Sequence, residues 1–137
     1  MKAISIRQPW ATLVVHGLKT IELRNWKRKY NILPQSLYIH TGSRVDKTAP
    51  VEVWQLAEQF ETSKVRGAII GMVNLIEMFL YDNAEKFDLD RGLHLTNWEY
   101  TENLYGLRMK DAMLIDKPVN YRGQLGLFNV DGKITQY

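Results

Sequence analysis

The amino-acid sequence predicts a fold of the α+β or mainly β class, a small, mostly antiparallel β-barrel with flanking helices. The chain has 137 residues, of which 45% are hydrophobic, and this length is typical of one globular domain over 1–137. Several stretches are apolar and β-branched or alternate with the two-residue period of a strand. They are not separated by regularly spaced helices, which disfavours a doubly wound parallel sheet and favours a barrel.

The first half of the chain is expected to contribute three short strands and two helices. The strands are predicted over 3–6, 20–26 and 36–40. Pro9 suits the start of the first helix because its missing N–H would be unpaired there, and Gly17 suits a left-handed end. A second helix is predicted over 50–60, where apolar side chains recur at helical spacing.

The second half is expected to be richer in strand. Residues 67–79 are apolar and β-branched and predict a central strand. Residues 80–100 are acidic and fit only short helical turns. A strand is predicted within 104–115, and a final strand over 121–130, where two glycines permit a bend or a close approach of backbone.

The composition excludes several classes of site. Cysteine is absent, which removes disulfide frameworks, thiol catalysis and Cys-ligated zinc. The three histidines lack metal-ligand spacing, and the segment 17–20 lacks the second glycine of a phosphate-binding loop. We therefore expect no metal and no cofactor. No signal peptide or membrane span is evident, so we expect a cytoplasmic protein without a membrane partner.

The charge is distributed unevenly along the chain. The net charge is +3, with 18 Lys and Arg against 15 Asp and Glu. Residues 1–47 carry +7 (nine basic, two acidic), residues 48–105 carry −6 (four basic, ten acidic) and residues 106–137 carry +2 (five basic, three acidic). This division favours an anionic partner for the first third of the chain, although a basic stretch is also compatible with an ordinary solvated face.

The most informative polar residues are Lys19, Glu22 and Arg24. Glu22 and Arg24 lie two apart on a predicted strand and share a face, and Lys19 lies in the turn just before it. Such a group can bind a phosphate or a base edge through the planar arginine fork. It can also do acid–base work if burial lowers the lysine pKa. A row of surface ion pairs along a strand edge is the structural alternative.

Aromatic side chains accompany these charges. Trp26 shares the strand face of Glu22 and Arg24, so it is the better candidate for stacking on an unpaired base. Trp10 follows Pro9 on the apolar face of the first helix and is predicted to be a core residue. The basic run 27–29 directly follows Trp26 and suits phosphates, or an ordinary solvated turn.

Three segments together resemble an ASCH domain, a small relative of the PUA domain. They are Ser5–Ala11 (SIRQPWA), Gly17–Trp26 (GLKTIELRNW) and Leu37–Thr41 (LYIHT). The segment 121–128 resembles the usual last strand. The likeness is strong over 1–42, fair over 67–79 and 118–130, and weak over 80–116.

The resemblance implies a PUA-like β-barrel with a cleft beside the first helix. It places Lys19, Glu22 and Arg24 in the cleft, with Gln8 and Trp26 flanking it, and implies RNA or a modified nucleoside or nucleotide as the ligand. Some members are amidohydrolases of acetylated cytidine, in which a lysine matching Lys19 acts with a threonine and a distant glutamate. This chain has Glu22 in place of that threonine. Other members are ribonucleases.

The sequence and the resemblance together are compatible with three functions. The first is a binding module that holds RNA or a nucleotide in the cleft. The second is a hydrolase, either an acetylcytidine-type amidohydrolase or a ribonuclease, with Lys19 and Glu22 as its catalytic residues. The third is a protein-interaction domain whose partner surface is the acidic set Glu77, Asp82, Glu85, Asp88 and Asp90, although these residues also fit simple solubilisation.

Overall fold

The computed structural model describes residues 1–26, 31–132 and 134. Its strands form one six-stranded sheet in the order β2-β5-β4-β3-β1-β6. The strands are β1 (Lys2–Ile6), β2 (Ile21–Asn25), β3 (Gln35–Thr41), β4 (Ala68–Leu80), β5 (Leu104–Asn120) and β6 (Leu127–Asn129). Only β1 and β3 pair in parallel, and the other neighbours are antiparallel. The predicted mainly antiparallel architecture is confirmed, and the sheet forms a curled half-barrel.

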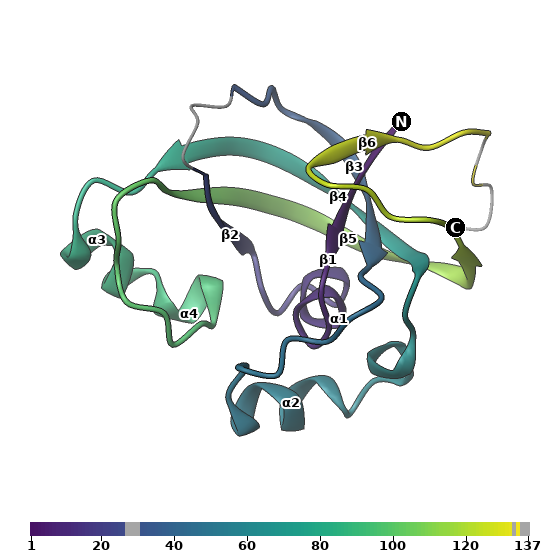
Figure 1. Cartoon of the computed structure of the whole chain (residues 1–137), viewed down its shortest axis with the longest axis horizontal. Coiled ribbons are helices and arrows are strands. Elements are labelled where there is room, and N and C mark those ends of the chain that lie inside the picture. Colours follow the sequence, from purple (N-terminus) through teal and green to yellow (C-terminus); the bar gives the residue numbers. More distant parts are fainter. Residues whose placement is uncertain (27–30, 133, 135–137) are drawn as a thin grey trace.

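The helices are short and lie inside and beside the curled sheet. They are α1 (Trp10–Val15), α2 (Val51–Ala57), the 3-10 turn η1 (Glu61–Lys64), α3 (Ala84–Leu89) and α4 (Arg91–His94). In Figure 1, β4 and β5 arch over α1, and α3 and α4 lie together at one end of the arch. The region 80–100 therefore holds the two helical turns that its sequence permits.

The long pair of β4 and β5 gives the sheet its curvature. Its register shifts between Ile69 and Gly71, between Met72 and Asn74, and between Leu75 and Glu77. Each such irregularity bends the strand and increases its twist. The result is that β2 and β1, which are separated by three strands in the sheet, come within hydrogen-bonding distance of each other: Arg24 Nη2 donates to Ser5 O at 3.0 Å.

The main core lies between α1 and the concave face of the sheet. All six residues of α1 are buried, and Leu13, Val14, Ile39, Val73 and Leu107 belong to one apolar cluster. Gly71 allows this close packing, because a Cβ there would lie 2.9 Å from Val15 and 2.4 Å from Met113 O. The apolar face predicted for the first helix thus anchors it inside the half-barrel.

Most predicted elements are confirmed, with two differences. The second helix ends at Ala57 rather than Phe60, and a separate 3-10 turn follows it. The predicted strand over 121–130 is wrong in extent, since only Leu127–Asn129 forms a strand. Gly126 has a φ of +66°, a left-handed conformation that makes a turn before β6. The basic run 27–29 lies outside the described residues. No helix of the described part is long and apolar enough to span a membrane.

Candidate nucleotide-binding groove

An open groove of about 1070 Å³ lies where β2 approaches β1. Its walls come from β1, β2, the end of β3, the segment 42–48, residues 96–98 and the loop 121–126. Among its lining residues are five cations and two carboxylates: Arg7, Lys19, Arg24, Arg44, Arg122, Glu22 and Asp46. Four of the five predicted site residues line it, namely Lys19, Glu22, Arg24 and Trp26.

Lys19 is a buried cation at the base of this groove. Its side chain is almost fully buried, although lysine is among the residues least often found inside a protein. Lys19 Nζ donates to the carbonyl oxygen of His94, lies 3.8 Å from Glu22 Oε1 and sits 4.8 Å from the centre of the Trp10 ring. Burial lowers its pKa to about 8, against the opposing effect of Glu22, and Arg24 adds to the lowering.

Glu22 and Arg24 extend this row across the mouth of the half-barrel. Arg24 Nη2 lies 2.9 Å from Glu22 Oε2 and also donates to Ser5 O. Arg24 Nε is buried and has no hydrogen-bond partner among the described residues. The surface ion-pair row considered from the sequence is not what forms, since Lys19 and Glu22 are both buried.

Three indole rings lie along the groove. Trp10 is buried in the core, as predicted, and its Nε1–H donates to Asp46 Oδ2 at 2.8 Å, while the ring also lines the groove beneath Lys19. Trp26 lines the groove and lies 5.7 Å from the Tyr105 ring. Trp98 is the third. It lies in the segment whose sequence gave no clear pattern, and no signal in the sequence singled it out.

Gln8 lies elsewhere. It does not line the groove, although its backbone oxygen accepts from the N–H of Asp46, which does. Its side chain is fully buried, with Nε2 donating to the carbonyl oxygens of Thr62 and Val65 and Oε1 accepting from Thr12 N. These three hydrogen bonds join α1 to the end of η1, which is a structural role.

Ser5, His40 and Tyr121 form a polar cluster in the groove that sequence reasoning missed as functional. His40 Nε2 lies 2.6 Å from Tyr121 O, and a carbonyl only accepts, so Nε2 carries the proton. His40 Nδ1 is therefore an acceptor for the Ser5 hydroxyl, 2.9 Å away. Burial lowers the pKa of His40, and the hydrogen bond to Tyr121 opposes this. In the sequence, the only feature that could have indicated a functional His40 was its position at the end of a predicted strand, next to small polar residues.

Gly123 brings the loop 121–126 onto this cluster. A Cβ at Gly123 would lie 2.7 Å from His40 Cε1 and 3.3 Å from Ser5 Oγ, closer than side chains tolerate. The loop can therefore cover the Ser5–His40 pair only because residue 123 has no side chain. It also contributes Arg122 to the lining of the groove.

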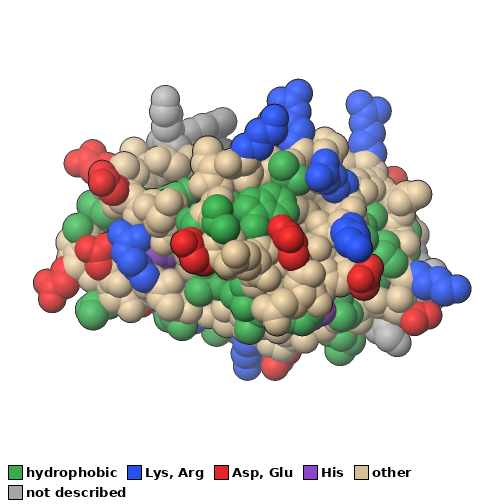
Figure 2. Space-filling model, turned by 90° about the horizontal axis from the view of Figure 1, so that it is seen from below, with side chains coloured by type: hydrophobic (Ala, Val, Ile, Leu, Met, Phe, Trp, Pro, Cys, Tyr) green, Lys and Arg blue, Asp and Glu red, His purple; other side chains and the backbone are tan. Residues whose placement is uncertain are grey.

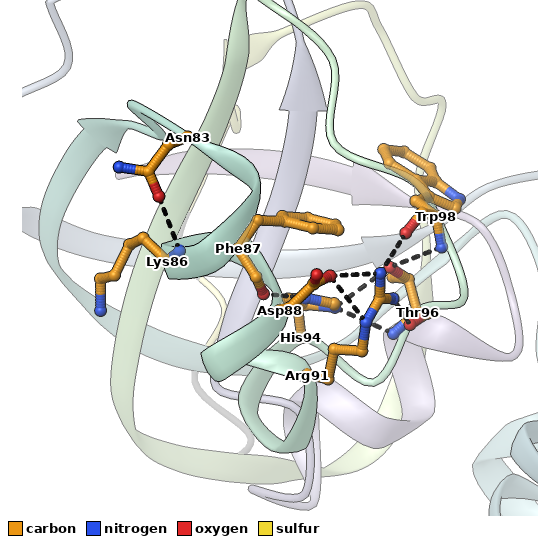
Figure 3. A network of polar contacts seen from close by, with 8 residues as sticks. All are labelled: Asn83, Lys86, Phe87, Asp88, Arg91, His94, Thr96 and Trp98. Carbon is orange, nitrogen blue, oxygen red and sulfur yellow. Dashed lines mark hydrogen bonds and ion pairs between the residues drawn. The ribbon is translucent and has the colours of Figure 1, made fainter.

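A separate polar network holds the other wall (Figure 3). The His94 ring stacks on Phe87 with centroids 4.4 Å apart, its Nδ1 accepts from Thr96 N, and its Nε2 donates to Phe87 O. Arg91 donates to Asp88 and to the carbonyl oxygens of Thr96 and Trp98. This network fixes residues 96–98 and presents His94 O to Lys19.

Acidic residues that were considered as a partner surface form ion pairs within the chain. Asp88 pairs with Arg91, Asp90 with Lys86, and Glu77 with Arg108, at 2.7, 3.1 and 2.8 Å. Three of the five acids considered as a partner surface thus form ion pairs within the chain. Figure 2 shows Asp and Glu concentrated towards one end of the face it draws, and Lys and Arg gathered along its upper margin and opposite half. Within the described residues, no three His, Asp or Glu side chains come together as metal ligands.

The comparisons with known proteins agree with this architecture. The family model described as "ASCH domain" matches residues 4–113. The crystal structure of ASCH from Zymomonas mobilis matches with a TM-score of 0.63 and 16% identity, covering 94% of this chain and 86% of that chain. Two substituted forms of the Zymomonas mobilis protein, one serine-to-alanine and one tyrosine-to-phenylalanine, each match with a TM-score of 0.60 and 16% identity. They cover 94% of this chain and 87% and 88% of those chains.

No curated protein matches the chain. At 16% identity the solved structures establish the fold alone. The family model covers most of the chain, including the segments that carry Lys19, Glu22, Arg24 and the final turn of α4. The chain therefore belongs to the ASCH domain family.

Proposed function

We propose that this ASCH domain binds either a segment of single-stranded RNA or a modified nucleoside or nucleotide. The binding site is the groove between β2 and β1. The observation that carries the proposal is the combination of five cations and three indole rings along one open groove. Membership of the ASCH family supports a nucleic acid ligand at the level of the family.

Each part of the groove suits one part of a nucleotide. Indole rings offer surfaces on which unpaired bases stack, worth about 1–3 kcal/mol per base. The Arg24 guanidinium lines the groove, and arginine donors suit phosphate or base-edge oxygens. Arg7, Arg44 and Arg122 are exposed at the rim, where they can neutralise phosphates.

Binding is tested by fluorescence anisotropy with labelled single-stranded RNA, and by indole fluorescence with nucleosides and nucleotides. We expect Trp26→Ala and Arg24→Gln to weaken binding, since they remove a stacking surface and a donor. Lys110→Gln is the matched control, because Lys110 is exposed on β5 and lines neither described cavity. A flat titration at low salt with every one of these ligands would refute the proposal.

Hydrolysis of a nucleic-acid-derived substrate is the second candidate, favoured by the buried Lys19. With a pKa of about 8, about one-tenth of this amine is neutral at pH 7 and can accept a proton. In this role Lys19 would take a proton from the attacking water or hydroxyl group, and Glu22 would orient the Lys19 amine. Arg24 would hold the developing oxyanion or phosphate.

Turnover distinguishes the two candidates. Acetylcytidine and RNA are incubated with the wild-type protein and with Lys19→Ala, and products are followed by mass spectrometry. Loss of turnover in the folded variant supports catalysis by Lys19. Equal turnover in the variant identifies a contaminant, and binding without turnover of either substrate leaves the domain as a binding module.

A further inference from the structure

A second basic depression adjoins the groove. It has a volume of about 590 Å³ and is lined by Arg7, Ser43, Arg44, Val45, Asp46, Lys47, Thr48 and Arg66. Five of these residues also line the groove, namely Arg7, Ser43, Arg44, Asp46 and Thr48. The two surfaces are therefore continuous, and a ligand longer than one nucleotide could extend from one into the other.

The charges in this depression are unbalanced. It has four cations, Arg7, Arg44, Lys47 and Arg66, and one carboxylate, Asp46. None of these four cations lies within ion-pair distance of a carboxylate of the described chain, whereas Lys86, Arg91 and Arg108 each do. Like charges gathered without counter-charges repel one another, and an anion relieves that repulsion.

Asp46 does not cancel this excess. Its Oδ2 accepts from Trp10 Nε1 and its Oδ1 accepts from the backbone N–H and the hydroxyl of Thr48. Burial alone would raise the pKa of Asp46, but these hydrogen bonds and the nearby Arg7 lower it. The carboxylate is thus a fixed part of the loop, bonded to its own neighbours rather than to the four cations.

The loop that carries Arg44 and Lys47 is held in shape. Asp46 N donates to Gln8 O and Gly42 N donates to Ile6 O, so the segment 42–46 is tied to β1 and the start of α1. An ordered loop loses little conformational entropy when it binds a ligand. Arginine also presents donors in a planar fork that matches phosphate oxygens.

We propose that this depression binds phosphates of a single-stranded RNA whose neighbouring base occupies the groove. The ligand of the domain is then an RNA strand several nucleotides long, rather than a free nucleoside. This inference rests on the proposed function and specifies its substrate class. Lys47 and Arg66 line the depression but not the groove, so they allow the two surfaces to be tested separately.

The test compares the double variant Lys47→Gln/Arg66→Gln with wild type, using uridine and adenosine octamers and the corresponding nucleoside monophosphates. Each phosphate contact on a single strand contributes about 0.7 to the slope of log K against log salt. We expect the double variant to bind the octamers more weakly and with a slope reduced by about 1.4, and to bind the monophosphates as wild type does. Lys110→Gln/Lys117→Gln has the same charge change outside both cavities, and should leave octamer binding unchanged.

The outcomes separate this inference from the proposed function. Unchanged octamer affinity and slope in Lys47→Gln/Arg66→Gln would overturn the inference and leave the groove as the binding site. An equal loss in the Lys110→Gln/Lys117→Gln control would also overturn it, since net charge alone would then explain binding. If Trp26→Ala and Arg24→Gln have no effect on octamer binding while Lys47→Gln/Arg66→Gln does, the depression binds RNA and the groove proposal fails.

Discussion

Arg24 joins two strands that the sheet keeps apart, because its Nη2 donates to the backbone carbonyl of Ser5 across the mouth of the half-barrel. β2 lies at one edge of the sheet, and β5, β4 and β3 separate it from β1. The same nitrogen contacts Glu22, so one guanidinium both closes the curl and neutralises a buried carboxylate.

We therefore expect Arg24→Gln to destabilise the fold by roughly 1–3 kcal/mol, since the change removes the closer of the two cations that pair with the buried Glu22 carboxylate, together with the bond to Ser5 O. Chemical denaturation measures the effect. Arg108→Gln is the matched control, because it also removes a pair with a glutamate, but one that is more exposed, and should cost less than about 1 kcal/mol. Equal losses in the two variants would contradict a special role for the Arg24 bridge.

Lys19 should make stability depend on pH in the alkaline range. Its pKa falls from 10.5 to about 8 on folding, so between these values the unfolded chain binds a proton that the folded chain has released. Stability should then rise with pH from about 8 to 10.5, by up to about 3 kcal/mol. Below pH 8 the full cost of the buried charge is present.

The measurement is the free energy of unfolding of wild type minus that of Lys19→Met between pH 8 and 10.5, because other titrating groups cancel in the difference. A flat difference would show that Lys19 is not desolvated.

His40 and His94 should be neutral at pH 7 with the proton on Nε2. In each ring Nε2 faces a backbone carbonyl, Tyr121 O or Phe87 O, while Nδ1 accepts from Ser5 or from Thr96. Burial lowers the pKa of both, against the effect of those carbonyls. Nitrogen-15 chemical shifts of the imidazole rings report the tautomer directly. A proton on Nδ1 of either ring at pH 7 would be inconsistent with the hydrogen bonding described here.

The same pKa shifts predict how stability changes in acid. Because the folded pKa values lie below 6.5, the unfolded chain takes up protons first as the pH falls. Stability should therefore decline as the pH decreases from about 6.5 towards the folded values, and His40→Gln should reduce that decline.

Gly123→Ala should displace the loop 121–126 from the Ser5–His40 pair. The new methyl group would overlap His40, and overpacking of this kind costs about 1–3 kcal/mol. Thermal unfolding and the imidazole resonances of His40 measure the effect. Gly92→Ala is the control, since a Cβ there meets nothing within 4 Å, and it should be neutral or slightly stabilising. An unchanged His40 spectrum in Gly123→Ala would show that the loop does not rest on the ring.

The sequence was most informative where a local pattern decides the structure. Alternation in 20–26 separated Ile21 and Leu23, which pack in a core cluster, from Glu22 and Arg24, which line the groove. Pro9 and Gly17 bounded α1 correctly, and Gly17 has a φ of +76°. Each of these outcomes depends on residues within one turn or one strand.

Relationships between distant segments could not be predicted in the same way. The placement of Gln8 depends on carbonyl oxygens more than fifty residues away, and the Ser5–His40 contact depends on parallel pairing of β1 with β3. Residues 121–126 have a strand-like composition, but Gly123 and Gly126 turn them into a covering loop. The segment that brings Trp98 to the groove is held by Arg91, which donates to Trp98 O, and by Thr96, whose hydroxyl accepts from Trp98 N.

The contact between Lys19 and the turn of residues 91–96 has an evolutionary consequence. Asn83 caps α3, Arg91 and His94 organise the turn that follows, and Lys19 touches this turn through one backbone oxygen rather than through a side chain. A main-chain atom is present whatever residue occupies position 94. The side chain at position 94 can therefore change in the course of evolution, provided that the turn keeps its shape, without removing the oxygen that accepts from Lys19 Nζ.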